Sequence, residues 1–211
     1  MRISSMFRIR QIAMSALLLI ALTTVESETL FGRDLVAALR AGGYVILMRH
    51  ASSPGHPPDA QRADAENVQH ERQLDALGRS SAQAMGEALR RLQIPIGAVL
   101  SSPTYRALET VQLAKLGQPI TFMELGDGGQ GGTGEDSERA KWLKARTATP
   151  PAAHENTVIV THFSTIREAY PGRADDLAEG EALILHPDGK GGASVVARVK
   201  IDDWASLSGG R

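Results

Sequence analysis

The feature that most constrains this chain is an apolar run that ends abruptly in an arginine and a histidine. Residues 44–48 are all apolar, and Arg49 and His50 follow directly. Such a run, with glycines before it and Ser, Pro and Gly after it, predicts an internal strand of a sheet covered on both faces. Sheets of this kind bind ligands just beyond the carboxyl ends of their strands. At that edge the guanidinium of Arg49 can bind an anion, and a neutral ring nitrogen of His50 can attack that anion as a nucleophile.

The N-terminus carries the pattern of an export signal. Three arginines within the first ten residues precede an apolar stretch at residues 12–22, and the first acidic residue is Glu26. A basic start followed by a short apolar stretch is typical of a secretory signal peptide. We therefore expect residues 1–27 to be cleaved near Ser27 and the mature protein to be periplasmic or secreted. An uncleaved anchor is the alternative, but an apolar stretch of eleven residues is too short to span a bilayer comfortably, so no stable membrane span is expected.

Composition limits the number of domains and the kinds of site that the rest of the chain can have. The sequence has 211 residues, of which 42% are apolar and 22% charged, so residues 28–211 suit one domain with a substantial core. Without residues 1–27 the chain keeps 20 basic and 23 acidic residues, a formal charge of −3, which gives no basic face for nucleic acid. Cysteine is absent, and this excludes disulfides, a thiol nucleophile and thiolate metal sites.

Hydrophobic periodicity and turn residues predict an alternation of strands and helices. Helical spacing marks residues 29–41, 74–92, 102–116, 135–147 and 164–170, and strand patterns mark residues 44–48, 96–100, 120–125, 157–161, 181–186 and 193–201. Ser102 and Pro103 are expected to be the N-cap and the first residue of their helix. This order predicts an α/β three-layer sandwich with a mainly parallel central sheet and helices on both faces.

Two segments are expected to be loops. Residues 52–72 are polar with three prolines, and a loop of this length in a compact domain is usually functional or disordered. Residues 126–134 are glycine-rich but lack the ending of a phosphate-binding P-loop, so a lid or linker is favoured. Arg72, at the end of the first loop, fits equally the rim of a pocket and the entrance of a helix.

Two further stretches repeat the chemistry of the first. Arg106 falls in the first turn of a helix that follows a strand, so its guanidinium and the free N–H groups of the helix both favour an oxyanion. A surface ion pair with Glu109 is the alternative interpretation. His162 directly follows the strand at residues 157–161. Alone it suits a structural histidine, but two histidines and two arginines at one sheet edge predict a pocket for a dianionic phosphoryl group.

With these stretches the chain resembles the histidine phosphatase superfamily, also called phosphoglycerate mutase-like, in its first branch. The resemblance spans residues 44 to about 186 and rests on four motifs. They are Leu-Met-Arg-His-Ala at residues 47–51, Arg-Gln-Leu at 72–74 with Leu-Gly-Arg at 77–79, Ser-Ser-Pro-x-x-Arg-Ala-x-x-Thr at 101–110, and Val-Thr-His at 160–162. The third motif is the most specific.

The resemblance implies a role for each matched residue. His50 would be the nucleophile that takes up the phosphoryl group, with Nδ1–H bound to a backbone carbonyl and Nε2 free. Arg49, Arg106 and His162 would hold the equatorial oxygens. No metal and no cofactor are implied, and the other histidines show no metal-ligand spacing: His56, His70, His154 and His186.

The family also uses a carboxylic acid, buried beside the phosphate, that protonates the leaving oxygen. Glu124 is expected to fill this role, because it lies at the end of the strand predicted at residues 120–125 and so on a rigid element. Asp127 is the alternative, although it lies inside the glycine-rich segment.

The chain departs from the family pattern at several positions. Phe163 stands where the first branch usually has Gly and where the second branch has an acid, which argues against a phytase-like enzyme. Ala51 is a small variant of the usual Gly. The Asn that mutase-like members carry after the nucleophile has no clear counterpart in residues 52–61, so mutase activity is not expected.

The sequence therefore predicts a metal-independent phosphatase that hydrolyses phosphomonoesters through a phosphohistidine intermediate. Its substrate would be a small phosphorylated molecule or an accessible phosphoryl group on a protein. Two alternatives remain open. One is a phosphohistidine-protein phosphatase, and the other is a non-catalytic module that binds phosphate or a sugar phosphate. The sequence indicates neither the physiological substrate nor an oligomeric state.

Overall fold

The computed structural model describes residues 29–56, 71–127, 134 and 137–207. The predicted signal peptide, most of the loop at residues 52–72 and most of the glycine-rich segment lie outside the described residues. Within the described ranges, no helix is both long and apolar enough to cross a membrane.

In the described part of the chain the sheet has six strands, in the order β3-β2-β4-β1-β5-β6. They are β1 (Val45–Arg49), β2 (Ile96–Ser101), β3 (Ile120–Thr121), β4 (Asn156–Thr161), β5 (Ala182–Pro187) and β6 (Ala193–Val199). The pairs β1 with β4, β4 with β2 and β2 with β3 are parallel, whereas β5 is antiparallel to both β1 and β6. The carboxyl ends of β1, β2 and β4 therefore lie at the same edge of the sheet.

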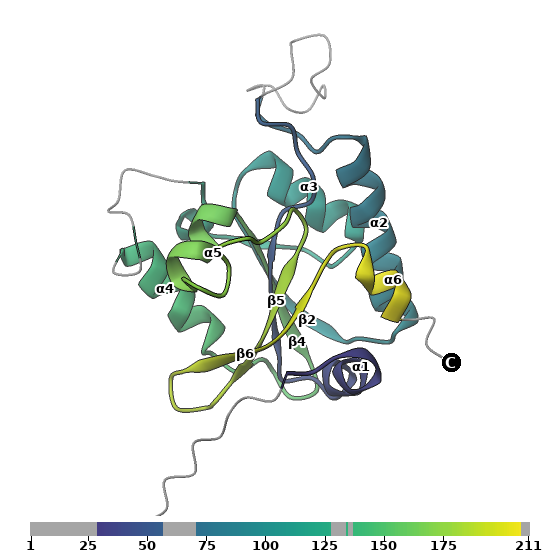
Figure 1. Ribbon diagram of the computed structural model, residues 1–211, viewed down its shortest axis with the longest axis vertical. Helices are drawn as coiled ribbons and strands as arrows, with labels where there is room; N and C mark the ends of the chain where they lie inside the picture. The colour runs from purple at the N-terminus through teal and green to yellow at the C-terminus, as the bar shows by residue number, and fades with distance from the viewer. Residues whose placement is uncertain (1–28, 57–70, 128–133, 135–136, 208–211) are drawn as a thin grey trace, which may run out of the picture.

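Helices cover both faces of the sheet (Figure 1). One face carries α1 (Gly32–Ala41), α2 (Ala76–Arg91), α3 (Tyr105–Ala114) and α6 (Asp203–Leu207), and the other carries α4 (Glu138–Thr147) and α5 (Phe163–Ala169). Ile46 and Met48 of β1 pack into the first core, and Val45 and Leu47 into the second. Because β1 is buried on both faces, its sequence is apolar without interruption. The predicted α/β three-layer fold is confirmed.

Two local predictions are wrong, and one helix was not predicted. The strand predicted at residues 120–125 ends at Thr121, and a short 3-10 helix, η1 (Met123–Leu125), turns Leu125 into the second core. The third long helix begins at Tyr105, because Ser102 still donates its N–H to Val160 O (2.9 Å) as part of the sheet. No pattern predicted α6, which buries Trp204 in the first core.

Candidate active site

The backbone of His50 is held by bonds from both neighbouring segments. Its N–H donates to Thr161 O (2.9 Å), and its carbonyl accepts from the N–H of Gly180 (2.9 Å). The next N–H, of Ala51, donates to Thr110 Oγ1 (3.1 Å), and that hydroxyl in turn donates to a carbonyl of α3. The threonine of the Ser-Ser-Pro motif thus ties α3 to the strand end that carries His50.

The His50 ring is buried and neutral. Its Nδ1 lies 2.8 Å from Ala51 O, so Nδ1 carries the proton and Nε2 keeps its lone pair. Burial, together with the charges of Arg106, Arg49 and Arg72, lowers the pKa of His50 to about 4, although the bond to Ala51 acts in the opposite direction. The hydrogen bond that was predicted between Nδ1 and a backbone carbonyl is present.

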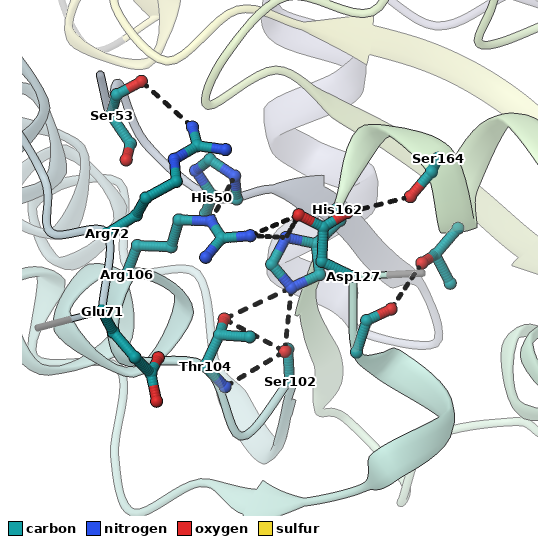
Figure 2. Close-up of polar contacts among 12 residues, drawn as sticks. His50, Ser53, Glu71, Arg72, Ser102, Thr104, Arg106, Asp127, His162 and Ser164 are labelled. Atoms are coloured by element: carbon teal, nitrogen blue, oxygen red, sulfur yellow. Dashed lines mark hydrogen bonds and ion pairs between the residues drawn. The ribbon is translucent and has the colours of Figure 1, made fainter. Parts of the chain in front are cut away.

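Arg106 connects the two histidines. It lies in the first turn of α3, is only 5% exposed, and donates through Nε to His50 Nε2 (3.2 Å) and through Nη2 to His162 Nδ1 (3.1 Å), as Figure 2 shows. The centroids of the two imidazole rings are 5.2 Å apart. Glu109, the alternative partner of Arg106, accepts instead from Arg79 Nε (2.7 Å) and so joins α2 to α3. The structure thus brings Arg106, His50 and His162 together at one sheet edge.

His162 follows β4 and has the opposite tautomer. Its Nδ1 accepts from Arg106, so the proton lies on Nε2, which is 2.9 Å from Ser102 Oγ and 3.3 Å from Thr104 Oγ1. Burial and the charge of Arg106 lower the pKa of His162 to about 3, against the effect of Asp127. Ser102, which was expected to cap a helix, orients this histidine.

Asp127 is the carboxylate that reaches the cluster. Its Oδ2 accepts from Arg106 Nη2 (2.5 Å) and lies 3.9 Å from His162 Nδ1, and its Oδ1 accepts from Ser164 Oγ (3.2 Å), as Figure 2 shows. Partial burial opposes ionisation of Asp127. The charge of His162, when protonated, and the charge of Arg106 outweigh burial and lower the pKa of the carboxyl.

Glu124, expected as the acid, is not brought to this cluster. It is exposed on η1, and its carboxylate has no hydrogen bond with a described residue. The chain bends after β3 because Leu125 is buried and its carbonyl accepts from Thr161 Oγ1 (2.7 Å), while Thr165 Oγ1 donates to Gly126 O (3.1 Å). These bonds to β4 and α5 direct the following residue, Asp127, toward the histidines.

Arg49 lies beside the cluster and already has partners. Its guanidinium donates to Glu179 Oε1 (2.9 Å) and to Leu177 O (3.2 Å), and it lies 5.6 Å from the centre of the Phe163 ring. Arg167 lies 5.3 Å from the same ring. Phe163, at the position where the family usually has Gly, thus contacts two guanidinium groups. Arg49 is near enough to His50 for its charge to lower the pKa of that ring.

Arg72 lies at the cluster as well, which favours its role at the pocket rim. Figure 2 shows its side chain beside His50, with a hydrogen bond to Ser53 O (3.3 Å). Its charge contributes to the lowered pKa values of His50 and His162. The preceding Glu71 accepts the N–H of Tyr105 (2.6 Å) at the start of α3. Sequence reasoning left Arg72 undecided, although its place in the second motif was a signal.

The arrangement combines a nucleophilic nitrogen with guanidinium groups and an ionised carboxylate. An anion between Arg106 and His162 would face the Nε2 lone pair of His50. Among the described residues there is no group of three or more His, Cys, Asp or Glu side chains that could hold a metal ion.

Part of the chain that carries this site matches a known family. Residues 45–128 match the histidine phosphatase superfamily (branch 1). The predicted resemblance to this superfamily is confirmed. The match includes His50, Arg106 and Asp127 and ends before His162. No curated protein matches the chain.

Solved structures share the histidine phosphatase fold. The structure of the protein histidine phosphatase SixA complexed with tungstate is 16% identical, covers 76% of this chain and 98% of its own, and superposes with a TM-score of 0.55. A phosphoserine phosphatase mutant from Entamoeba histolytica, in complex with phosphoserine, is 13% identical, covers 75% and 97%, and has a TM-score of 0.51. At these identities the likeness concerns the fold.

Proposed function

We propose that this chain is a metal-independent phosphatase that hydrolyses phosphomonoesters through a phosphohistidine on His50. The observation that carries the proposal is the neutral His50 ring, whose Nε2 lone pair lies against the guanidinium of Arg106 at 3.2 Å. A neutral imidazole is the nucleophilic form, and a preorganised cation beside it stabilises the charge that develops on a transferring phosphoryl group.

The reaction would proceed in two displacements. His50 Nε2 attacks phosphorus, and the bond to the leaving oxygen breaks while Arg106 holds the phosphoryl oxygens. His162, neutral in the free protein, would gain a proton and become a donor when a dianion binds beside it, because a nearby negative charge raises a pKa. Water then attacks the phosphohistidine, which releases inorganic phosphate and restores the imidazole.

The acid that protonates the leaving oxygen is proposed to be Asp127 in place of Glu124. Asp127 is at the cluster, whereas Glu124 is exposed outside it. An acid matters most for a poor leaving group, so Asp127→Asn should slow alkyl phosphates more than aryl phosphates. Glu124→Gln is the matched control and should slow neither. A leaving-group-dependent loss confined to Glu124→Gln would restore the original assignment.

The nucleophile is tested by trapping the intermediate with ³²P-labelled substrate. Label should be stable to alkali and lost in acid, as a phosphoramidate is, and it should disappear in His50→Ala together with at least ~10³-fold of the rate. His186→Ala, which removes an exposed histidine of β5, is the control. Undiminished labelling of His50→Ala would contradict the proposal. Binding of phosphate without release from any substrate would favour the non-catalytic module.

A phosphohistidine-protein phosphatase is the second candidate. The carboxyl at the cluster has a lowered pKa and an ion pair with Arg106, so the free protein presents no protonated acid among these side chains. A leaving imidazole, with an ordinary pKa of about 6.5, needs far less help than an alkoxide. The shared fold with a protein histidine phosphatase agrees with this candidate. It predicts faster turnover of a phosphohistidine peptide than of any alkyl phosphate.

We also propose that the protein is exported, because residues 1–27 have the basic start and the apolar stretch of a signal peptide. Mass determination of the N-terminus after cell fractionation tests it, and full-length protein in the cytoplasm would refute it.

A further inference from the structure

The Asp127 carboxylate occupies the place that an anionic ligand of this cluster would need. Its Oδ2 lies 2.5 Å from Arg106 Nη2 and 3.9 Å from His162 Nδ1. Figure 2 shows the carboxylate beside the guanidinium of Arg106 and the ring of His162. A phosphoryl oxygen held by Arg106 through the same Nη2 would compete with Oδ2 for that donor.

The carboxylate is held there by contacts that do not depend on Arg106. Ser164 Oγ, in the first turn of α5, donates to Oδ1 at 3.2 Å. The two residues before Asp127 are fixed through their carbonyls by the hydroxyls of Thr161 and Thr165. Asp127 is therefore positioned on both of its oxygens and through its backbone.

A second donor nitrogen of Arg106 at this cluster is also engaged. Arg106 Nε donates to His50 Nε2 at 3.2 Å, so the nucleophilic lone pair and the cation satisfy each other in the free protein. A phosphoryl group that binds Arg106 through Nη2 and faces the Nε2 lone pair of His50 would therefore replace two contacts of Arg106, the one with Asp127 and the one with His50.

We propose that Asp127 is a built-in competitor of phosphate, which fills an oxyanion position of the cluster until substrate displaces it and returns when phosphate leaves. The inference rests on the proposed function, because it assumes that Arg106 and His162 form the phosphoryl site. It gives Asp127 a role in the free protein that is separate from proton donation. Its consequence is that inorganic phosphate, the product, binds less tightly than the cations alone would allow.

The two roles of Asp127 are linked by the displacement. A carboxylate that leaves Arg106 loses its cation and gains a dianion as neighbour, and both changes favour its protonation. The same event that opens the phosphoryl site would then give Asp127 the proton that a leaving oxygen needs.

Calorimetric measurement of phosphate binding to the full chain tests the inference. Asp127→Asn keeps the shape of the side chain and removes its charge. The side chain of Asp127 is 43% exposed and that of Arg106 only 6%, so the effect should exceed that of a surface pair. We expect phosphate to bind about tenfold tighter to Asp127→Asn, which corresponds to about 1.4 kcal/mol. The constant for phosphate inhibition of aryl phosphate hydrolysis should fall by a similar factor.

Two further variants make the test specific. Glu124→Gln removes the same charge three residues away, from an exposed side chain outside the cluster, and should leave phosphate binding unchanged. Ser164→Ala removes one contact of the carboxylate and should tighten binding roughly twofold, as the loss of one modest hydrogen bond implies. Weaker binding in Ser164→Ala would overturn the inference, because Ser164 would then hold phosphate directly.

The outcomes separate the inference from the proposed function. If wild type binds phosphate and Asp127→Asn binds it equally or more weakly, the inference is overturned while the phosphoryl site stands. If Glu124→Gln tightens binding as much as Asp127→Asn, the effect is one of general charge and the inference also fails. If neither wild type nor any variant binds phosphate, both the inference and the proposed phosphoryl site are refuted.

Discussion

The titration of His50 is the most direct consequence of its environment. In the folded protein burial and three guanidinium groups lower the pKa of His50 from 6.5 to about 4. The unfolded chain takes up a proton near the ordinary value, whereas the folded chain does not. The unfolded state therefore binds more protons between these two values, and stability must fall as the pH decreases through this window.

The size of the effect follows from the two pKa values. At about pH 5 the unfolded His50 is almost fully protonated and the folded one almost fully neutral, which reduces the free energy of unfolding by about 2 kcal/mol relative to neutral pH. Above about pH 7.5 both states are almost entirely neutral, and His50 causes almost no pH dependence there. For a domain of this size the loss corresponds to a decrease in Tm of about 4–8 °C.

Denaturant unfolding of wild type and His50→Asn, at neutral pH and about pH 5, measures this contribution. Asparagine can place an N–H where Nδ1–H donates to Ala51 O, and it does not titrate. The stability of His50→Asn should decrease less between the two pH values than that of wild type, by about 2 kcal/mol. NMR titration of the His50 ring gives the pKa itself. A ring that titrates near 6.5, or equal pH dependence of the two proteins, would refute the argument.

Three further predictions concern the structure around the site. Ser102→Ala removes the nearer acceptor of the His162 Nε2–H, and we expect a loss of about 1 kcal/mol in denaturant unfolding together with a higher KM. Gly86→Ala would place a Cβ 1.9 Å from Ala114 O, between α2 and α3, so thermal unfolding should reveal a destabilisation of about 1–3 kcal/mol. A chelator should leave the rate of phosphate release unchanged, because guanidinium groups supply the positive charge in the proposed reaction.

Much of the site could be predicted because it follows from the sheet. β1 and β4 are buried on both faces, so each contains an apolar run, at residues 45–48 and 158–160, that ends clearly at Arg49 and at Thr161. Parallel neighbours place their carboxyl ends together, and the histidines that follow must then meet. The position of Arg106 depends only on the start of α3 after β2. These are local patterns joined by a general rule of topology.

The placement of Glu124 outside the cluster could not be predicted, because it depends on bonds between distant segments. Residues 120–125 have a strand-like sequence, but β3 is an edge strand of two residues, and burial of Leu125 turns the chain into η1. The hydroxyl of Thr161 that fixes this turn lies 36 residues along the chain. A short sequence segment around Glu124 or Asp127 does not include Thr161 and so cannot predict this turn.

The neighbours of Arg49 were missed for a similar reason. Glu179 and Phe163 lie far from it in sequence. Their contacts with its guanidinium form only when the segment before β5, which carries Glu179, and the start of α5, which carries Phe163, fold against β1. The sequence marked Phe163 as unusual for the family. In the structure its ring lies against the guanidinium of Arg49.

The two backbone bonds of His50, to Thr161 O and from the N–H of Gly180, belong to the pairing that holds the centre of the sheet. Its amide should therefore exchange with solvent only when the whole domain opens, and not through local fraying. A peripheral strand or helix can loosen without moving the nucleophile. The position of the nucleophile and the global fold would then be lost in a single event.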